Sequence, residues 1–264
     1  MMFADYHVHS DLSEDCQCPM EDMILRGIEL GLNEMAFTEH ADHGMEAAGV
    51  VAVEYPPYME LFDRMKEKYK DKITLRYGVE FGIQVHTIPI FEQILSHQSF
   101  DFIILSNHQV DNKEFWNQDF QRGKTQEEFQ QAYYQETYEV VKRFKNYSVL
   151  GHLDMIKRYD KVGEYPDEKI MDICEKIFRQ VIEDGKGIEV NTSCFRYGLK
   201  DLTPSKELLR LYHRLGGTVL TLGSDAHTTE HLGAHMEDVR EVLKEIGFKY
   251  FCTFKDMKPE YHLL

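Results

Sequence analysis

Histidine and acidic side chains occur in this sequence where a cluster of divalent metal ions would need them. Six histidines, one glutamate and one aspartate each lie at or just after the end of a strand-like segment: His7, His9, His40, His108, His152, His227, Glu80 and Asp225. Placement by chance would scatter such residues over both ends of strands and through helices. Imidazole nitrogens combined with carboxylate oxygens suit Zn, Mn or Fe. Several ions at one rim of a barrel favour hydrolytic chemistry.

The opening run Asp5-Tyr6-His7-Val8-His9 places two of these histidines two residues apart on a predicted strand. Because side chains alternate between the two faces of a strand, both imidazoles point the same way and can share one ion. Asp5 lies on that face as well, and we expect it to orient one of the imidazoles. A His-x-His pair alone is a weak signal, so the metal hypothesis depends on the other positions.

The elements that must position these residues alternate along the whole chain. Short β-branched or aromatic runs predict strands at residues 3–8, 34–39, 73–80, 101–107, 147–151, 187–191 and 218–223. Segments of helical period predict helices at 20–31, 57–70, 88–97, 125–145, 167–185, 204–215 and 237–246. Strict alternation implies a parallel sheet. Ligands that come from all around the chain favour a closed (β/α)7 barrel over an open sheet, with an eighth unit near 250–254 as the alternative.

Individual boundaries carry recognisable signals. Thr125 with Glu128 three residues later predicts a capping box. Thr203-Pro204 predicts an N-cap followed by the first helical residue of the next helix.

Bulk composition predicts one domain over residues 1–264, because no Pro/Gly/Ser linker and no internal repeat interrupts the chain. The first strand-like segment begins almost at Met1, which leaves no room for a signal peptide. No run reaches the about 20 apolar residues of a membrane span. Five cysteines without a disulfide-like framework indicate a reducing compartment, so we expect a cytoplasmic location.

The formal net charge of −16 argues against nucleic acid or an anionic membrane as the main partner. It does not argue against a small anionic substrate, because bound divalent ions can make a pocket locally positive. An oligomer is compatible with the composition.

Four segments in chain order resemble the motifs of the PHP superfamily, named for polymerase and histidinol phosphatase. They are Asp5-x-His7-x-His9, Thr38-Glu39-His40, Glu80 followed by His108, and Asp225-Ala226-His227. The segments Gly151-His152-Leu153-Asp154 and Glu189-Val190-Asn191-Thr192-Ser193, with Arg196, resemble the monofunctional histidinol-phosphate phosphatase branch. The resemblance covers essentially the whole chain.

This resemblance implies an α/β fold, a distorted (β/α)7 TIM-like barrel with three divalent ions (Zn, Mn or Fe) at the C-terminal rim of the strands. The first ion would be held by His7, His9, Glu80 and Asp225. Glu80 would bridge to a second ion, completed by His108 and His152. The third ion would be held by Asp15, His40 and His227, with Asp11 or Glu14 as alternatives to Asp15.

The predicted reaction is metal-dependent hydrolysis of L-histidinol phosphate to L-histidinol and phosphate, a step of histidine biosynthesis. Hydrolysis of a phosphate monoester requires on the order of 20 kcal/mol of catalysis. Clustered metals activate water, bind the phosphoryl oxygens and neutralise the leaving alkoxide. We predict in-line attack on phosphorus by a metal-bound hydroxide, with Asp225 accepting its proton. The alternatives are a PHP phosphoesterase acting on nucleotides or another small phosphomonoester, and a metal-bound barrel without catalysis.

Further residues are expected to act on the substrate. His43 follows His40 at the same rim and could protonate the leaving group or contact the substrate. Arg158, with Lys157 as its neighbouring alternative, and Arg196 could bind phosphate bidentately. Asp154 could hold a ligand histidine or bind the substrate amino group.

Two further predictions concern the orientation of the histidines and access to the site. Asp42 could orient His40 or His43. The long segment 109–124, which contains Trp116, Arg122 and Lys124, is expected to act as a lid or specificity element.

Overall fold

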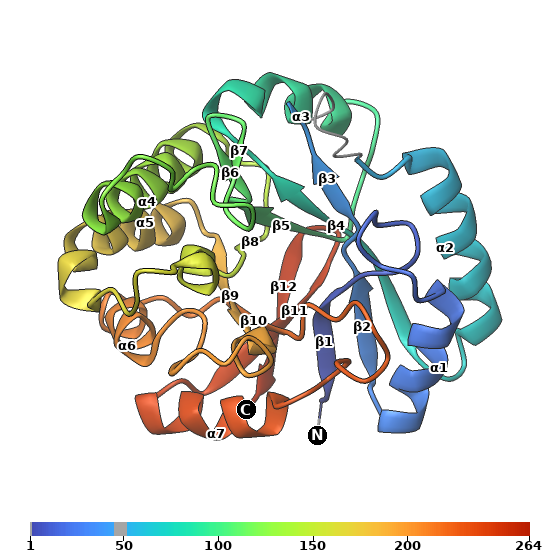
Figure 1. Ribbon diagram of the computed structural model, residues 1–264. Helices are drawn as coiled ribbons and strands as arrows, with labels where there is room; N and C mark the ends of the chain where they lie inside the picture. Colours follow the sequence, from blue (N-terminus) through green and yellow to red (C-terminus); the bar gives the residue numbers. More distant parts are fainter. Residues whose placement is uncertain (1, 45–51) are drawn as a thin grey trace.

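The computed structural model describes residues 2–44 and 52–264, and its centre is a parallel sheet that curls into a nearly closed barrel (Figure 1). The strands lie in the order β1 (Ala4–Val8), β2 (Glu34–Phe37), β4 (Thr74–Gly82), β5 (Phe102–Ser106), β8 (Val149–Leu150), β9 (Gly187–Asn191) and β10 (Leu220–Gly223). The short strand β3 (His40–Asp42) continues the course of β2 along β4. The predicted (β/α)7 barrel is confirmed.

The barrel closes between its first and last strands. The backbone N–H of His9 donates to the carbonyl of Ala226 at 3.0 Å, and the N–H of Ala226 donates to the carbonyl of His7 at 3.2 Å. These bonds lie beyond the end of β10, so closure takes place at the rim that carries the predicted ligands. The same backbone bonds therefore place His7 and His9 beside Asp225 and His227.

Within residues 2–44 and 52–264, seven helices surround the sheet (Figure 1). They are α1 (Met20–Leu30), α2 (Tyr55–Tyr69), α3 (Ile88–Leu95), α4 (Gln126–Arg143), α5 (Met171–Glu183), α6 (Lys206–Arg214) and α7 (Met236–Ile246). Their inner faces are apolar at helical spacing; in α5, for example, the buried residues are Cys174, Ile177, Phe178 and Val181. No helix among the described residues is long and apolar enough to cross a membrane.

Two predicted helix starts have different outcomes. The capping box of Thr125 and Glu128 is present at the start of α4. The prediction that Thr203 caps α6 is wrong, because the hydroxyl of Ser205 accepts from the N–H of Leu208 and the helix begins at Lys206. Thr203 is used elsewhere, since its carbonyl accepts the N–H of Asn191 at 2.7 Å beside β9.

The segment near 250–254 does not supply an eighth barrel unit. It forms β11 (Tyr250–Lys255), which pairs antiparallel with β12 (Lys258–Leu263). Asp256 and Met257 between them both have positive φ, which suits a two-residue hairpin turn and leaves no length for a crossover helix. The hairpin packs against the barrel through the ring of Phe254, which lies 5.1 Å from that of Phe102.

Short elements complete the connections at the ligand-bearing rim. They are the 3-10 turns η2 (Val85–Thr87), η3 (Met155–Tyr159), η4 (Asp167–Lys169) and η5 (Thr192–Cys194), and the small antiparallel pair β6 (Gln109–Val110) and β7 (Lys113–Glu114). Because all barrel strands run the same way, every loop that follows a strand opens on this one rim.

Candidate metal centre

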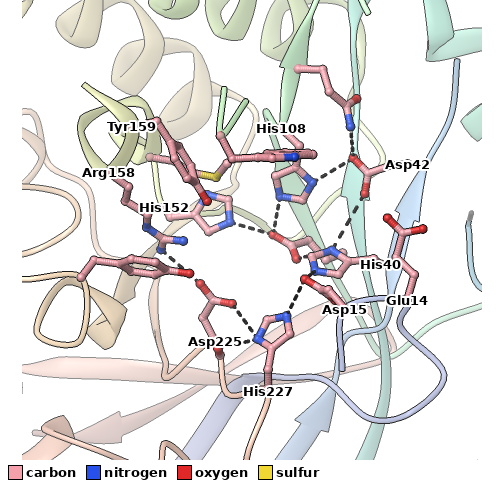
Figure 2. Close-up of a pocket in the computed structure, with 15 residues that line it drawn as sticks. Glu14, Asp15, His40, Asp42, His108, His152, Arg158, Tyr159, Asp225 and His227 are labelled. Atoms are coloured by element: carbon pink, nitrogen blue, oxygen red, sulfur yellow. Dashed lines mark hydrogen bonds and ion pairs between the residues drawn. The ribbon is translucent and has the colours of Figure 1, made fainter. Parts of the chain in front are cut away.

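A cavity of about 350 Å³ opens at the C-terminal rim of the strands (Figure 2). Its lining includes most of the predicted ligands, namely Asp15, His40, Glu80, His108, His152, Asp225 and His227. The other two, His7 and His9, are fully buried in the barrel wall beside it. The fold thus brings all nine predicted ligands to one place from loops and strands far apart in the sequence.

The carboxylate of Glu80 is the centre of this cluster. It projects from β4 and is fully buried. Five imidazole nitrogens lie within 3.6 Å of its oxygens: His7 Nε2 (3.1 Å), His9 Nε2 (3.6 Å), His40 Nδ1 (3.0 Å), His108 Nε2 (3.1 Å) and His152 Nε2 (2.8 Å). A carboxylate with imidazoles around both oxygens is placed to bridge two ions.

Potential ligand atoms of the described residues form four overlapping groups, and within each group the atoms lie within 4.8 Å of one another. They are His7 with His9 and Asp225, His7 with Glu80 and His152, His40 with Glu80 and His108, and His9 with His40 and His227. The groups share members, as expected for several ions held close together rather than for separate sites.

Asp15 comes from the loop after β1 and faces the two outermost histidines. Its Oδ2 lies 3.1 Å from Nε2 of His227 and 3.6 Å from Nε2 of His40. Of the two alternatives, Glu14 lines the cavity, whereas Asp11 is exposed and does not line it. Asp15 therefore has the better geometry for an ion shared with His40 and His227.

A separate observation also indicates that these residues suit divalent metals. Nε2 of His9 is buried, and the described residues provide no hydrogen-bond partner for it. The nearest carboxylate oxygens are those of Glu80 at 3.6 Å and Asp225 at 3.8 Å. A buried nitrogen without a partner is costly, and an ion bound by all three groups would satisfy it. Nitrogen and oxygen donors of this kind suit Zn, Mn or Fe.

The electrostatics keep the carboxylates ionised. Burial by itself would raise the pKa of Glu80, but the charges of His7, His108 and His40 hold that pKa well below its usual range. Asp225 is also buried, which raises the pKa, yet His7 and Arg158 hold its pKa well below normal. Both groups are therefore available as anionic ligands at neutral pH.

Zinc uptake by the metal-free protein is expected to release protons at about pH 8 and to weaken as the pH falls. Burial by itself would lower the pKa of His108, but Asp42 and Glu80 raise it to about 10, so this imidazole must lose a proton to bind zinc. Calorimetry in buffers of different ionisation enthalpy measures this release. Zinc binding without proton release would contradict the prediction.

The raised pKa of His108 also affects the stability of the metal-free protein. Because the folded-state pKa of His108 is above the unfolded value of about 6.5, its ion pairs stabilise the fold fully below that pH. The contribution is lost as the pH rises through about 10.

The carboxylates that were expected to orient the ligand histidines have other partners in the structure. Asp42 contacts Nδ1 of His108 at 2.9 Å, whereas it lies 3.9 Å from His40. Within the described part of the chain, Asp5 contacts no imidazole; its carboxylate accepts the backbone N–H groups of Ser224 and Gly233, each at 2.9 Å. The reason is that Nδ1 of His7 is paired with Glu189 at 2.6 Å, whereas Asp5 faces the loop after β10.

Arg158 is the predicted substrate residue that lines the cavity. It extends from η3, and its Nη2 lies 3.1 Å from Oδ2 of Asp225 and 3.3 Å from Oδ1 of Asn191. Its guanidinium lies over the ring of Tyr197 at 4.6 Å. Its Nε is buried and has no hydrogen-bond partner among the described residues, so the group retains donor capacity for an anion.

Arg196 and Asp154 have other partners and do not line the cavity. Arg196 donates to the backbone carbonyls of Ser224 (2.7 Å) and Asp225 (2.5 Å), which holds the loop in which Asp225 has a φ of 55°. Arg196 also lies 3.6 Å from Oδ2 of Asp225, and its direct contact to phosphate stays a prediction.

Asp154 is buried, and its Oδ2 lies 3.1 Å from the amine of Lys157. This carboxylate also accepts the N–H of Ser205 at 3.2 Å. Asp154 and Lys157 therefore fasten η3 to the start of α6, and the described residues place no imidazole against this carboxylate.

His43 packs edge to face on the ring of Phe91 at 5.3 Å, and it is not among the described residues that line the cavity. In the segment 109–124, Trp116 lines the cavity, whereas Arg122 pairs with Asp119 at 2.6 Å and Lys124 binds the carbonyl of Phe120. Gln109 of the same segment also lines the cavity, and the lid or specificity role of the segment stays a prediction.

Sequence reasoning missed one buried carboxylate and part of the cavity wall. Glu189 lies 2.6 Å from Nδ1 of His7, and Tyr159, Tyr197 and Met155 line the cavity. The signal for Glu189 was an acidic residue in the middle of a strand predicted to be buried, which requires a partner.

The fold and the site together define a barrel-shaped metal-binding protein, and comparison with known proteins specifies its family. Residues 5–193 match the PHP domain family. The chain is 32% identical to the histidinol-phosphatase of Lactococcus lactis subsp. lactis over 98% of this chain and 96% of that protein. It is 28% identical to the probable histidinol-phosphatase of Thermotoga maritima over 94% of each chain.

A solved structure agrees with this result. The crystal structure of the Lactococcus lactis histidinol phosphate phosphatase, complexed with zinc, L-histidinol and phosphate, matches with a TM-score of 0.88 and 31% identity over 98% of both chains. The chain therefore belongs to the PHP domain family, in its histidinol-phosphatase branch.

Proposed function

We propose that this protein hydrolyses L-histidinol phosphate to L-histidinol and phosphate with the help of three divalent metal ions. The observation that carries the proposal is the full-length likeness to a structure that holds zinc, L-histidinol and phosphate. It is combined with the six histidines and three carboxylates that this protein gathers in and beside the cavity. Histidine biosynthesis is the corresponding physiological role.

We expect the metal-binding groups to be distributed over three ions as the family resemblance implies. One ion would be held by His7, His9, Glu80 and Asp225, a second by Glu80, His108 and His152, and a third by Asp15, His40 and His227. When bound, such ions activate water, neutralise the phosphoryl oxygens and stabilise the leaving alkoxide.

The protein groups around the ions have separate tasks. Arg158 would bind a phosphoryl oxygen through the donor capacity of its guanidinium, which is held in place by Asn191 and Ser193. Asp225, kept anionic by its cationic neighbours, would accept the proton of the attacking water on its carboxylate.

The remaining wall of the cavity suits a substrate that carries both an aromatic ring and an ammonium group, rather than phosphate alone. Trp116 and Tyr159 lie edge to face at 6.4 Å, and both line the cavity together with Tyr197. Such rings can stack on a planar imidazole. Glu14 lines the same cavity, and its carboxylate can attract the ammonium group of an amino alcohol.

Replacement of Arg158 by methionine is expected to lower kcat/KM for the phosphate ester by about 100-fold, with most of the loss in KM, because a charge-assisted contact to the phosphate contributes about 2–3 kcal/mol. Steady-state kinetics on the zinc-loaded variant measures the change. An equal loss in R196M and R158M would argue against a direct role specific to Arg158.

The experiment that tests the function is phosphate release by the purified, metal-loaded protein from L-histidinol phosphate, nucleotides and sugar phosphates. Strong preference for L-histidinol phosphate supports the proposal. Preferential hydrolysis of nucleotides or another small ester would replace the substrate while keeping a metal phosphoesterase. Absence of any turnover with bound metal would indicate a barrel that binds without catalysis.

A further inference from the structure

Glu189 is a fully buried carboxylate that the proposed reaction does not use. It projects from the middle of β9 into the barrel. Its Oε1 lies 2.6 Å from Nδ1 of His7 on β1, and its Oε2 accepts the backbone N–H of His152 after β8 at 2.9 Å. One side chain therefore contacts two predicted ligand residues that lie 145 positions apart in the sequence (152 − 7).

The surroundings are shaped to accommodate this carboxylate. A Cβ atom at Gly223 on β10 would lie 2.2 Å from Oε1 of Glu189, so no side chain fits there without displacing it. Oε2 accepts a further hydrogen bond from Nδ2 of Asn191 at 3.1 Å. Glu189 thus fills a space between strands β1, β8, β9 and β10, and its position is held from several sides.

The contact to His7 determines which nitrogen of that imidazole can bind a metal. A neutral imidazole carries one N–H, and a carboxylate 2.6 Å from Nδ1 places the proton on Nδ1. Nε2 then presents its lone pair on the other side of the ring, where Glu80 lies at 3.1 Å and Asp225 at 3.9 Å. These are the two carboxylates that would share the ion with His7.

We propose that Glu189 is a positioning residue for the metal centre, which fixes the tautomer and direction of His7 and anchors the backbone at His152. It acts on ligands of two different ions at once, whereas Asp42 contacts the single ligand His108. The inference rests on the proposed function only in assuming that the cluster binds metal ions, and it does not depend on the substrate.

The test compares zinc binding by Glu189→Gln with the wild type, using competition against a chromogenic chelator and elemental analysis of zinc per chain. Loss of an outer contact of this kind lowers metal affinity by about 10–100-fold, and we expect that loss for the ions that use His7 and His152. The ion at Asp15, His40 and His227 should be retained. Wild-type affinity in folded E189Q would overturn the proposal.

A matched control separates positioning from general destabilisation. Glu34→Gln neutralises another buried carboxylate, which pairs with Arg76 at 2.8 Å near the start of β2, away from the ligand-bearing rim. This variant should keep wild-type zinc affinity. An equal loss of zinc in E34Q would show that the effect reports stability and would overturn the assignment.

A spectroscopic readout tests the tautomer directly. In zinc-loaded protein with 15N-labelled histidine, the long-range 1H–15N spectrum should show the ring of His7 with its proton on Nδ1, shifted by a short hydrogen bond. In E189Q this signal should be altered, whereas that of His108, whose Nδ1 contacts Asp42, should be unchanged. Should E189Q fail to fold, Glu189→Asp, which keeps the charge but shortens the side chain, should still weaken zinc binding. Unchanged zinc affinity and an unchanged spectrum in E189D would overturn the proposal. Neither readout uses a substrate. A protein that binds zinc but does not hydrolyse L-histidinol phosphate would therefore contradict the proposed function without contradicting the role of Glu189.

Discussion

Replacement of Glu80 by glutamine is expected to lower kcat/KM by on the order of 1,000-fold or more, because it removes an anionic ligand on which the metal chemistry depends. Glu80 lies within 3.6 Å of five imidazole nitrogens. Glutamine preserves the size of the side chain but removes the charge and half of the oxygen ligands. Metal content should fall together with activity.

The measurement is steady-state phosphate release combined with elemental analysis of E80Q and of the control E34Q. Glu34 is also buried, but it pairs with Arg76 and lies away from the ligand cluster. The control should retain metal and activity. Full activity and metal content in E80Q would refute the central role assigned to this carboxylate.

Removal of metal by a chelator is expected to abolish hydrolysis and to lower the thermal stability of the protein. Without ions, the buried Nε2 of His9 has no hydrogen-bond partner among the described residues, and its ring stacks on that of His40 at 4.2 Å. Bound ions remove this cost and stabilise the fold by about 4 kcal/mol per site when free metal is at about 1,000 times its Kd.

The measurement is activity and Tm after chelation, followed by stepwise return of Zn, Mn or Fe. Activity should return as the third equivalent binds, and the metal that restores the highest kcat/KM indicates the native ion. Hydrolysis by protein shown to be metal-free by elemental analysis would exclude the metal mechanism. Maximal activity at one equivalent would instead support a single-ion site.

The ligand cluster was predictable because the fold brings the residues at the ends of the strands together at one rim. Each of His108, His152 and Asp225 directly follows a strand-like run, and the carboxyl ends of parallel strands meet at one rim. Alternation of βα units predicted that parallel arrangement, so local sequence and topology were sufficient to bring these residues together. The same logic applies to His7 and His9, whose spacing of two puts them on one face.

The partners of those ligands required the tertiary structure. Glu189 meets His7 across 182 positions, and Asp42 meets His108 rather than the nearer His40. Such pairs depend on the rotation of each strand and on side-chain reach across the barrel, neither of which leaves a periodic trace in the sequence.

The directions of the two loop arginines also required the tertiary structure. Arg158 and Arg196 had equal standing as phosphate ligands in the sequence, since each follows a strand. In the structure Arg158 lines the cavity, while Arg196 turns to the carbonyls of Ser224 and Asp225. The sequence alone determined which residue types reach the metal rim and the chemistry they can perform. The tertiary structure decided which of them face the cavity, because loop conformation and competing hydrogen bonds set the direction of each side chain.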